Sequence, residues 1–277
     1  MNRIEGRYIS LLTDFGFMRI FGTTPNKDLL INFLNSLFEG FQVIKDVKYL
    51  NSEHVGDVFA ERKPIFDVYC ENEKGEKFIV EMQNASIFPI REQAPKGADW
   101  NFKLDHVYIV ALLNFDLEVE AFDKNDINHD VGLLDKKTHK VFNDKLSFKY
   151  VEIAKFDKTE DELVTLYDKW LYVLKNLSRL DERPAALKEK VFTKLFEEAE
   201  IAKFTPTELK EYEDSLKAYR DVKNSIDTAL EKGREEGRAE SKNLKVIQIA
   251  KKMLAAGMDI DTIINMTDLS KSEIEKL

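Results

Sequence analysis

Apolar residues near the start of the chain recur every three or four positions, which is the spacing of one face of an α-helix. The pattern predicts a first helix over residues 14–21, ended by Gly22 and Pro25, and a second over residues 26–38, ended by Gly40. The apolar positions are Phe17, Ile20, Phe21, Leu29, Leu30, Phe33, Leu34, Leu37 and Phe38. We therefore expect two amphipathic helices that pack on a common core.

The following segments have the pattern of β-strands. Residues 64–70 and 77–83 alternate between apolar and polar positions, as strands with two different faces do. The nearly continuous apolar run at 106–115 predicts a strand buried on both faces. Further strands are expected within residues 43–50 and 141–153. Helices followed by such strands predict a fold that combines helices with a β-sheet.

The two alternating strands are close enough to form a hairpin. Residues 73–75 fit a three-residue loop with Gly75 in the left-handed conformation. In the register that this loop sets, Asp67 lies directly opposite Glu81. Gln83 shares their face, because side chains alternate along a strand. The sequence thus predicts two carboxylates and an amide on one face of a hairpin.

From residue 161 onward the pattern is helical again. Helices are expected over 163–174 and 184–230, with 231–240 as a charged helical or frayed linker. Three short helices are expected at the end of the chain, over 244–256, 259–266 and 271–277. Asp259 would cap the second helix, and Ser270 would cap the third in a capping box with Glu273. Their expected core is Ile249, Ala250, Met253, Leu254, Ile260, Ile263, Ile264, Leu269, Ile274 and Leu277.

Composition narrows the class of protein. The chain has 277 residues, of which 43% are apolar and 34% are charged, so it has enough apolar side chains for a sizeable core. No apolar run approaches the ~18 residues of a membrane span, the N-terminus lacks the apolar block of a signal peptide, and one cysteine cannot form an internal disulfide. We therefore expect a cytoplasmic protein that does not associate with membranes.

The net charge bears on nucleic-acid binding. The chain carries −9 and has no strongly basic region, which counts against tight nonspecific binding to DNA. A nuclease with a local basic surface and acidic groups around a metal ion remains compatible with this balance.

Carboxylates directly opposite each other on a hairpin repel, unless water or a cation screens them. Mg²⁺ prefers oxygen ligands and is often held by one or two carboxylates. Asp67 and Glu81 are therefore candidate metal ligands, and the alternative interpretation is an exposed pair that faces water. The apolar neighbours of Glu81 favour the first interpretation.

Several segments resemble one known family. Thirteen residues separate Asp67 from Glu81-Met82-Gln83, which is similar to the PD-(D/E)XK nuclease signature in its E-x-Q form. The recombination-promoting nuclease/putative transposase family resembles this chain at TDFGFMRIFG (13–22), NKDLLINFLN (26–35), FDVYCENEKGEKFIVEMQ (66–83) and FPIREQAPKGADWNFKL (88–104), and again at GREEGRAE (233–240) and the C-terminal helices.

The resemblance implies an α/β fold, with a restriction-endonuclease-like mixed-sheet core that is flanked by helices and followed by an all-helical C-terminal region. It also implies a DNA endonuclease associated with recombination or mobile elements. It implies Mg²⁺ as the cofactor, with Mn²⁺ as an alternative, and hydrolysis of a phosphodiester by in-line attack of a metal-activated water. Asp67 and Glu81 would bind the metal, and Gln83 would replace the usual lysine and orient the water. Of Asp14 and Lys27, which lie in the family's N-terminal motifs, one would face the site, with Lys27 on a substrate phosphate. Helix-end capping and surface charge are the alternative roles for these two residues.

The resemblance and the order of elements predict three parts. Residues 1–175 would form the PD-(D/E)XK nuclease-like domain, 176–240 a charged helical region and linker, and 241–277 a three-helix tail similar to a helix-turn-helix. The tail would either read DNA or dock onto protein, and we expect it to mediate homo-oligomerisation. Its last helix contains Glu273 and Glu275, which favours docking over reading DNA.

Departures from the family pattern leave alternatives open. Met18 stands where relatives often have a basic residue, with Arg19 next to it. Only residues 84–87 separate Gln83 from Phe88, and this connection is shorter than the corresponding one in relatives. This short connection supports a catalytically weakened member that acts as a DNA- or protein-binding partner. The acidic balance supports a third possibility, a helical interaction protein on an α/β scaffold. The four histidines lack the spacing of a zinc site, and Cys70 is expected to point into the core.

Overall fold

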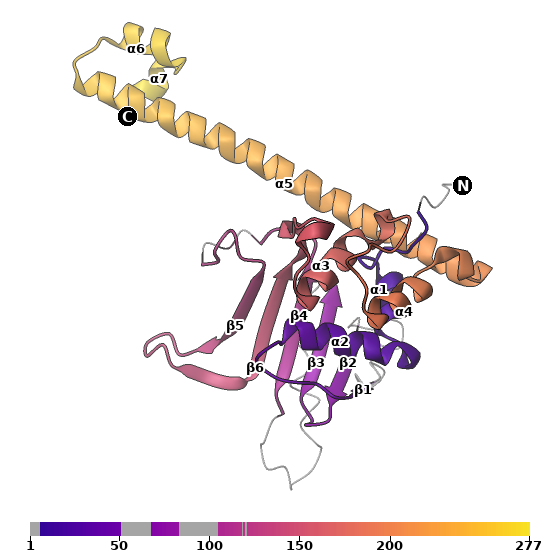
Figure 1. Ribbon diagram of the computed structural model, residues 1–277. Coiled ribbons are helices and arrows are strands. Elements are labelled where there is room, and N and C mark those ends of the chain that lie inside the picture. Colours follow the sequence, from indigo (N-terminus) through magenta and orange to yellow (C-terminus); the bar gives the residue numbers. More distant parts are fainter. Residues whose placement is uncertain (1–5, 51–67, 83–104, 118, 120) are drawn as a thin grey trace, which may run out of the picture. The chain divides into compact units, whose positions relative to one another are not determined.

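The structure, a computed structural model, describes residues 6–50, 68–82, 105–117, 119 and 121–277 (Figure 1). The chain divides into two compact units, Met1–Tyr219 and Arg220–Leu277. The first unit combines a sheet with helices, and the second is helical. The expected mixed α/β core with flanking helices, followed by a helical region, is confirmed.

In the described residues, the first unit is built on a six-stranded sheet with the order β1-β2-β3-β4-β6-β5. β4 is parallel to β3 and to β6, and the other neighbours are antiparallel. The strands are β1 (Val47–Tyr49), β2 (Val68–Asn72), β3 (Lys77–Met82), β4 (Val107–Leu113), β5 (Asn128–Leu134) and β6 (Val141–Glu152). All seven residues of β4 are buried, as expected for a central strand covered on both faces.

The α-helices of the first unit are α1 (Asp14–Phe21), α2 (Lys27–Leu37), α3 (Leu166–Asn176), α4 (Lys190–Glu198) and the start of α5 (Pro206–Ala255). Short 3₁₀ helices are η1 (Thr24–Asn26), η4 (Ile153–Lys155), η5 (Glu160–Glu162), η6 (Leu177–Arg179) and η7 (Ile201–Lys203). Thr13 caps α1 by accepting a hydrogen bond from the Gly16 amide, and Thr165 and Asp168 form a capping box on α3. These caps satisfy backbone amides that a helix start leaves without partners.

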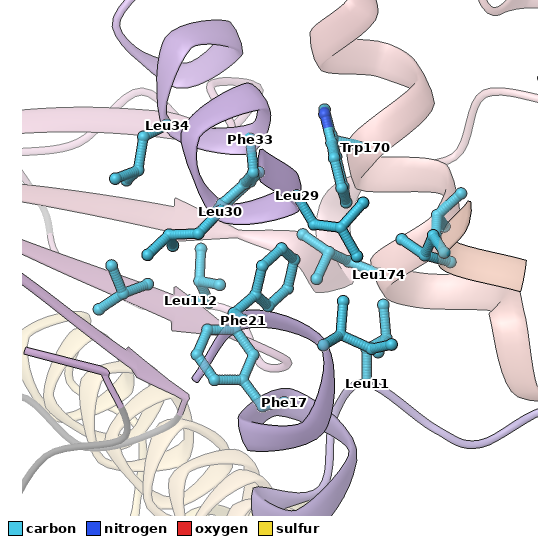
Figure 2. Packing of buried hydrophobic residues seen from close by; sticks show 14 of the residues in the cluster. Leu11, Phe17, Phe21, Leu29, Leu30, Phe33, Leu34, Leu112, Trp170 and Leu174 are labelled. Carbon is cyan, nitrogen blue, oxygen red and sulfur yellow. The ribbon is translucent and has the colours of Figure 1, made fainter. Parts of the chain in front are cut away.

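The main core lies between the helices and one face of the sheet, which we call the helix face. Figure 2 shows α2, α3 and the N-terminal helix converging there. Phe21, Phe33 and Trp170 stack in tilted or edge-on pairs with centroids 5.4–5.6 Å apart. The Trp170 indole donates to Asn32 Oδ1 at 2.8 Å, so its one polar atom is satisfied inside the core.

A smaller apolar cluster lies on the opposite side of the sheet, which we call the second face. Its buried members are Tyr69, Ile79, Val107, Ile109 and Leu146. Their neighbours along the strands, such as Val80 and Val110, belong to the main core. The sheet therefore has two apolar faces, and side chains alternate between them.

The C-terminal unit is a small helical cluster. Its helices are the end of α5, α6 (Ile260–Thr267) and α7 (Lys271–Ile274). Ala250, Ile263 and Ile274 form its buried core. The predicted caps are confirmed, since Asp259 accepts from the Thr262 amide and Ser270 forms a capping box with Glu273.

Most predicted elements are confirmed, with differences in extent. Both N-terminal helices, the hairpin strands as far as they are described, β4 and α6 occur where expected. Residues 141–153 contribute one strand, which agrees with the expected one or two. Only 47–49 of the segment 43–50 is a strand, and β5 was not predicted. The helix expected from 163 begins at Leu166, and the last helix ends at Ile274.

The helical region differs more from expectation. The helix predicted over 184–230 is wrong at its start and middle, because α4 ends at Glu198 and η7 separates it from α5. Residues 231–240 are helical, and 244–256 is not a separate helix, because α5 runs without a break to Ala255. Ile249 and Leu277, expected in the C-terminal core, are exposed.

Candidate functional site

The turn of the β2–β3 hairpin has the predicted geometry, with Gly75 in the left-handed conformation. Gly75 has φ +80°, and the Asn72 amide donates to the Glu76 carbonyl at 2.9 Å. The Asn72 side chain accepts hydrogen bonds from the amides of Lys74 and Glu76 and holds the loop closed. The strands follow in the expected register, with Tyr69 opposite Ile79.

The described register ends at the pair Val68–Val80. Asp67 and Gln83 lie outside the described residues, so their pairing stays a prediction. One further step in the same register corresponds to Asp67 opposite Glu81. By alternation from Ile79, residue 81 belongs to the second face of the sheet.

The backbone of Glu81 lies near the carboxyl end of β3, next to parallel strands. Glu81 pairs with Ala111 of β4, and Ala111 pairs with Tyr150 of β6. The carboxyl ends of parallel strands are where α/β proteins commonly place ligand sites. Ala111 itself is only 1% exposed, so β4 is covered at this point of the sheet.

The second face of the sheet also holds a buried polar cluster, which the sequence did not predict. Glu152 is fully buried, and by alternation it shares the face of Tyr150. Its carboxylate accepts hydrogen bonds from the Leu117 amide at 2.6 Å and Lys155 Nζ at 2.8 Å, and lies 2.7 Å from His129 Nε2. This cluster ties the segment after β4 to β5 and β6.

Burial of Glu152 alone would raise its pKa, because it disfavours the charged form. Hydrogen bonds from Lys155, Leu117 and His129 outweigh that effect and lower the pKa below its ordinary value. Phe122 stacks on the His129 ring with centroids 4.0 Å apart. The cluster therefore contains a carboxylate held charged inside the protein.

Lys27 lies at a different place from Glu81. Its ammonium pairs with Asp46 at 2.6 Å and lowers the pKa of that carboxyl. The Asp46 amide in turn donates to Glu73 in the hairpin turn. Glu81 is four residues along β3 from Lys77, about 13 Å at the usual strand rise, so the structure does not bring Lys27 to the Glu81 end.

Asp14 and Arg19 lie on α1. Asp14 is exposed in the first turn of that helix, where its negative charge interacts favourably with the positive end of the helix dipole. Arg19 donates to the Glu198 carbonyl at 3.0 Å, pairs with Glu208 at 2.5 Å and lies over Phe204. The Thr205 amide and Arg19 lower the pKa of Glu208 to about 2. Arg19 thus connects α1 to α4 and α5.

Two further sequence expectations concern metals and the cysteine. The described residues contain no group of three His, Cys, Asp or Glu side chains that could hold a metal ion. Cys70 is buried in the main core as predicted, and burial raises the pKa of its thiol to about 12. A thiol in this state is not a nucleophile.

A family model described as PD-(D/E)XK nuclease family transposase matches residues 11–229. The chain belongs to this family. The C-terminal helix-turn-helix domain of the Rpn/YhgA-like nuclease family matches residues 243–277. No curated protein and no solved structure matches the chain. The suspected family is confirmed, and the mixed sheet with its flanking helices is the restriction-endonuclease-like core of these nucleases.

Membership of the PD-(D/E)XK transposase family carries a coarse function. It links the chain to nucleases and to DNA recombination or mobile elements, and such nucleases generally use divalent metal ions. The C-terminal helix-turn-helix match indicates DNA binding. Every helix among the described residues is too short or too polar to cross a membrane.

Proposed function

We propose that the chain is a metal-dependent DNA endonuclease that hydrolyses phosphodiester bonds during recombination or the movement of mobile elements. The observation that supports this most directly is the register of the β2–β3 hairpin. Continued by one pair, it corresponds to Asp67 opposite Glu81 at the carboxyl end of β3. Membership of the PD-(D/E)XK family supports our assignment of this pair as the counterpart of the acidic residues in the nuclease signature.

In this proposal Asp67 and Glu81 hold a Mg²⁺ ion, with Mn²⁺ as an alternative. Their carboxylates are the oxygen donors that such hard cations take. The bound ion supplies an acidified water and charge neutralisation at the phosphate. Gln83 would orient the attacking water through its amide, and the two carboxylates would fix the position of the metal ion relative to the phosphodiester.

The C-terminal unit would bring the nuclease to DNA. The helix-turn-helix match supports DNA binding by residues 243–277, and oligomerisation through the same helices is a further part of the proposal. The proposal places the protein in the cytoplasm. A catalytically weakened family member would bind DNA in the same way without cleaving it, so cleavage is the property to measure.

The test is cleavage of plasmid and oligonucleotide DNA in Mg²⁺, Mn²⁺, Ca²⁺ or EDTA. We expect cleavage with Mg²⁺ or Mn²⁺, none in EDTA, and a loss of about 100-fold or more in Asp67→Ala or Glu81→Gln. Asp214→Ala, which removes an exposed carboxylate of α5, is the matched control and should cleave normally. Equal cleavage by wild type and Asp67→Ala would refute the assignment. No cleavage by a folded wild type that still binds DNA would favour the weakened binding partner.

A further inference from the structure

The end of the β5–β6 hairpin extends beyond the rest of the sheet. β4 pairs with β6 only from Leu146 onward, so residues 141–145 of β6 have β5 as their only strand neighbour in the described sheet. Leu134 pairs with Val141, and the Asp135 amide donates to the Lys140 carbonyl at 2.9 Å to close the turn. We call residues 133–145 the β-arm. Figure 1 shows it continuing past β4.

Apolar side chains on the β-arm are exposed to water. Phe142 is 78% exposed, Val141 66% and Leu134 54%. They do not belong to any of the apolar clusters of the described residues. An isolated two-stranded hairpin is marginally stable, and exposed aromatic groups lower solubility, so such a surface calls for a partner.

The β-arm is also locally basic in an acidic chain. It has four lysines (Lys136, Lys137, Lys140, Lys145) and two aspartates (Asp135, Asp144), which gives +2 against −9 for the whole chain. In the part of the chain that the structure describes, none of these lysines forms an ion pair. By contrast, Lys149, nearer the sheet, pairs with Asp130 at 2.5 Å.

Asp135, an acidic residue at the tip of the β-arm, stabilises the turn. Asp135 Oδ1 accepts hydrogen bonds from the Thr138 amide at 2.7 Å and the Thr138 hydroxyl at 2.6 Å. These bonds lower the pKa of Asp135 and fix the turn. The tip therefore presents Lys136, Lys137 and Lys140 outward on a defined loop.

We propose that the β-arm lies in the major groove of the same DNA duplex that the nuclease cleaves. This rests on the proposed nuclease function and adds a second contact to the DNA. A two-stranded ribbon has the size that the major groove admits. The tip lysines would contact phosphates on either side of the groove, and Phe142 would pack against base edges such as thymine methyl groups.

The sheet geometry gives the spacing between the two contacts. Glu81, Ala111 and Tyr150 lie side by side across three strands. Phe142 precedes Tyr150 by eight residues, about 26 Å along a strand. At about 3.4 Å per base pair, the β-arm should contact DNA roughly 8 base pairs from the cleaved bond.

The test compares variants of the full chain in which either the tip lysines or Phe142 are replaced by uncharged residues. Binding to a labelled duplex is measured by fluorescence anisotropy in EDTA over a series of salt concentrations. We expect the variant Lys136→Gln/Lys137→Gln/Lys140→Gln to bind about tenfold or more weakly and to reduce the salt slope by about 2–3. Phe142→Ser should weaken binding with an unchanged salt slope.

Lys188→Gln/Lys190→Gln/Lys210→Gln is the matched control, because these lysines are exposed, lie elsewhere on the first unit and form no ion pair in the described residues. It changes the net charge equally and should bind like wild type. Circular dichroism and thermal unfolding should show every variant folded, as expected for exposed side chains. Duplexes shortened to fewer than about 8 base pairs on the β-arm side should no longer distinguish wild type from the β-arm variant.

Each outcome separates the two proposals. Wild-type binding by both β-arm variants, or an equal loss in the control, overturns the DNA contact while Asp67-dependent cleavage stands. Weaker binding by the β-arm variants without cleavage by any protein keeps the contact and refutes the nuclease. A Phe142→Ser variant that dissociates an oligomer in sedimentation but binds DNA normally overturns the contact in favour of a second copy of the chain.

Discussion

At the scale of single residues, Glu152 has the environment with the clearest energetic consequence. It is a fully buried carboxylate, and one of its partners is the ammonium of Lys155, whose side chain is only 15% exposed. Glu152→Gln keeps the size of the side chain but leaves that ammonium without a counter-charge. We expect the free energy of unfolding at pH 7 to fall by about 2–4 kcal/mol. Urea denaturation followed by tryptophan fluorescence measures this, because Trp170 lies in the main core.

The pH dependence of this difference follows from the lowered pKa of Glu152. A carboxyl whose pKa is lower in the folded state stabilises the fold above its unfolded pKa, near ~4.3, and loses that contribution as the pH falls through the folded value. The gap between wild type and Glu152→Gln should therefore be largest near neutral pH and shrink below about pH 4. Glu197→Gln, an exposed control, should match wild type throughout. A gap independent of pH would contradict the ionised state.

Residues of this kind lie beyond what spacing can predict. His129, Glu152 and Lys155 come from β5, β6 and η4, and they meet the Leu117 amide from a fourth segment. Only the tertiary fold brings them together, so no spacing in the sequence could indicate this cluster. Asp67 and Glu81 could be proposed from the sequence because a short turn relates them directly.

At the scale of elements, the β2–β3 turn determines the register in which the two strands of the candidate site pair. Gly75 has φ +80°, and an added Cβ would meet only ordinary contacts with Asp105, at 3.6 Å or more. The effect of Gly75→Ala is therefore conformational, and we expect a loss of about 1–2 kcal/mol in unfolding free energy. Gly132→Ala in β5 is the matched control, because its Cβ would meet open space without a left-handed φ.

Thermal or urea unfolding of the two glycine variants distinguishes these cases. Gly132→Ala should lie within about 0.5 kcal/mol of wild type. If Gly75→Ala were as stable as wild type, the left-handed turn would not be required and the register argument for Asp67 and Glu81 would lose its anchor. A register slip by one residue would move every side chain of the strand to the other face.

The elements that the sequence predicted well are those with local signals. Turn chemistry defined the hairpin, a continuous apolar run defined β4, and capping residues defined α6 and the start of α7. β5 has no comparable signal, because most of Asn128–Leu134 is exposed and it is ordered by pairing with β6. The sequence left 231–240 open between a helical and a frayed linker. The segment is helical, because α5 continues through Gly233 and Gly237, where an added Cβ would meet open space.

At the scale of the whole molecule, the question is what the C-terminal unit contributes to DNA binding. The sequence predicted that Ile249 and Ile263 both lie in the C-terminal core, but only Ile263 is fully buried, and Ile249 is 52% exposed. Ile263→Asp puts a charge into a core of three buried residues and should unfold this unit, whereas Ile249→Asp should leave it folded.

The core of the first unit is formed by residues up to Tyr212, so both variants should retain the main thermal transition. If residues 243–277 bind DNA as their family match indicates, Ile263→Asp should reduce duplex affinity by about tenfold or more and Ile249→Asp should not. Anisotropy in EDTA measures the affinity, and sedimentation measures any oligomer lost in parallel. Unchanged DNA affinity together with loss of an oligomer in Ile263→Asp would assign these helices to self-association, and the β-arm and the nuclease hairpin would then account for DNA binding through the first unit alone.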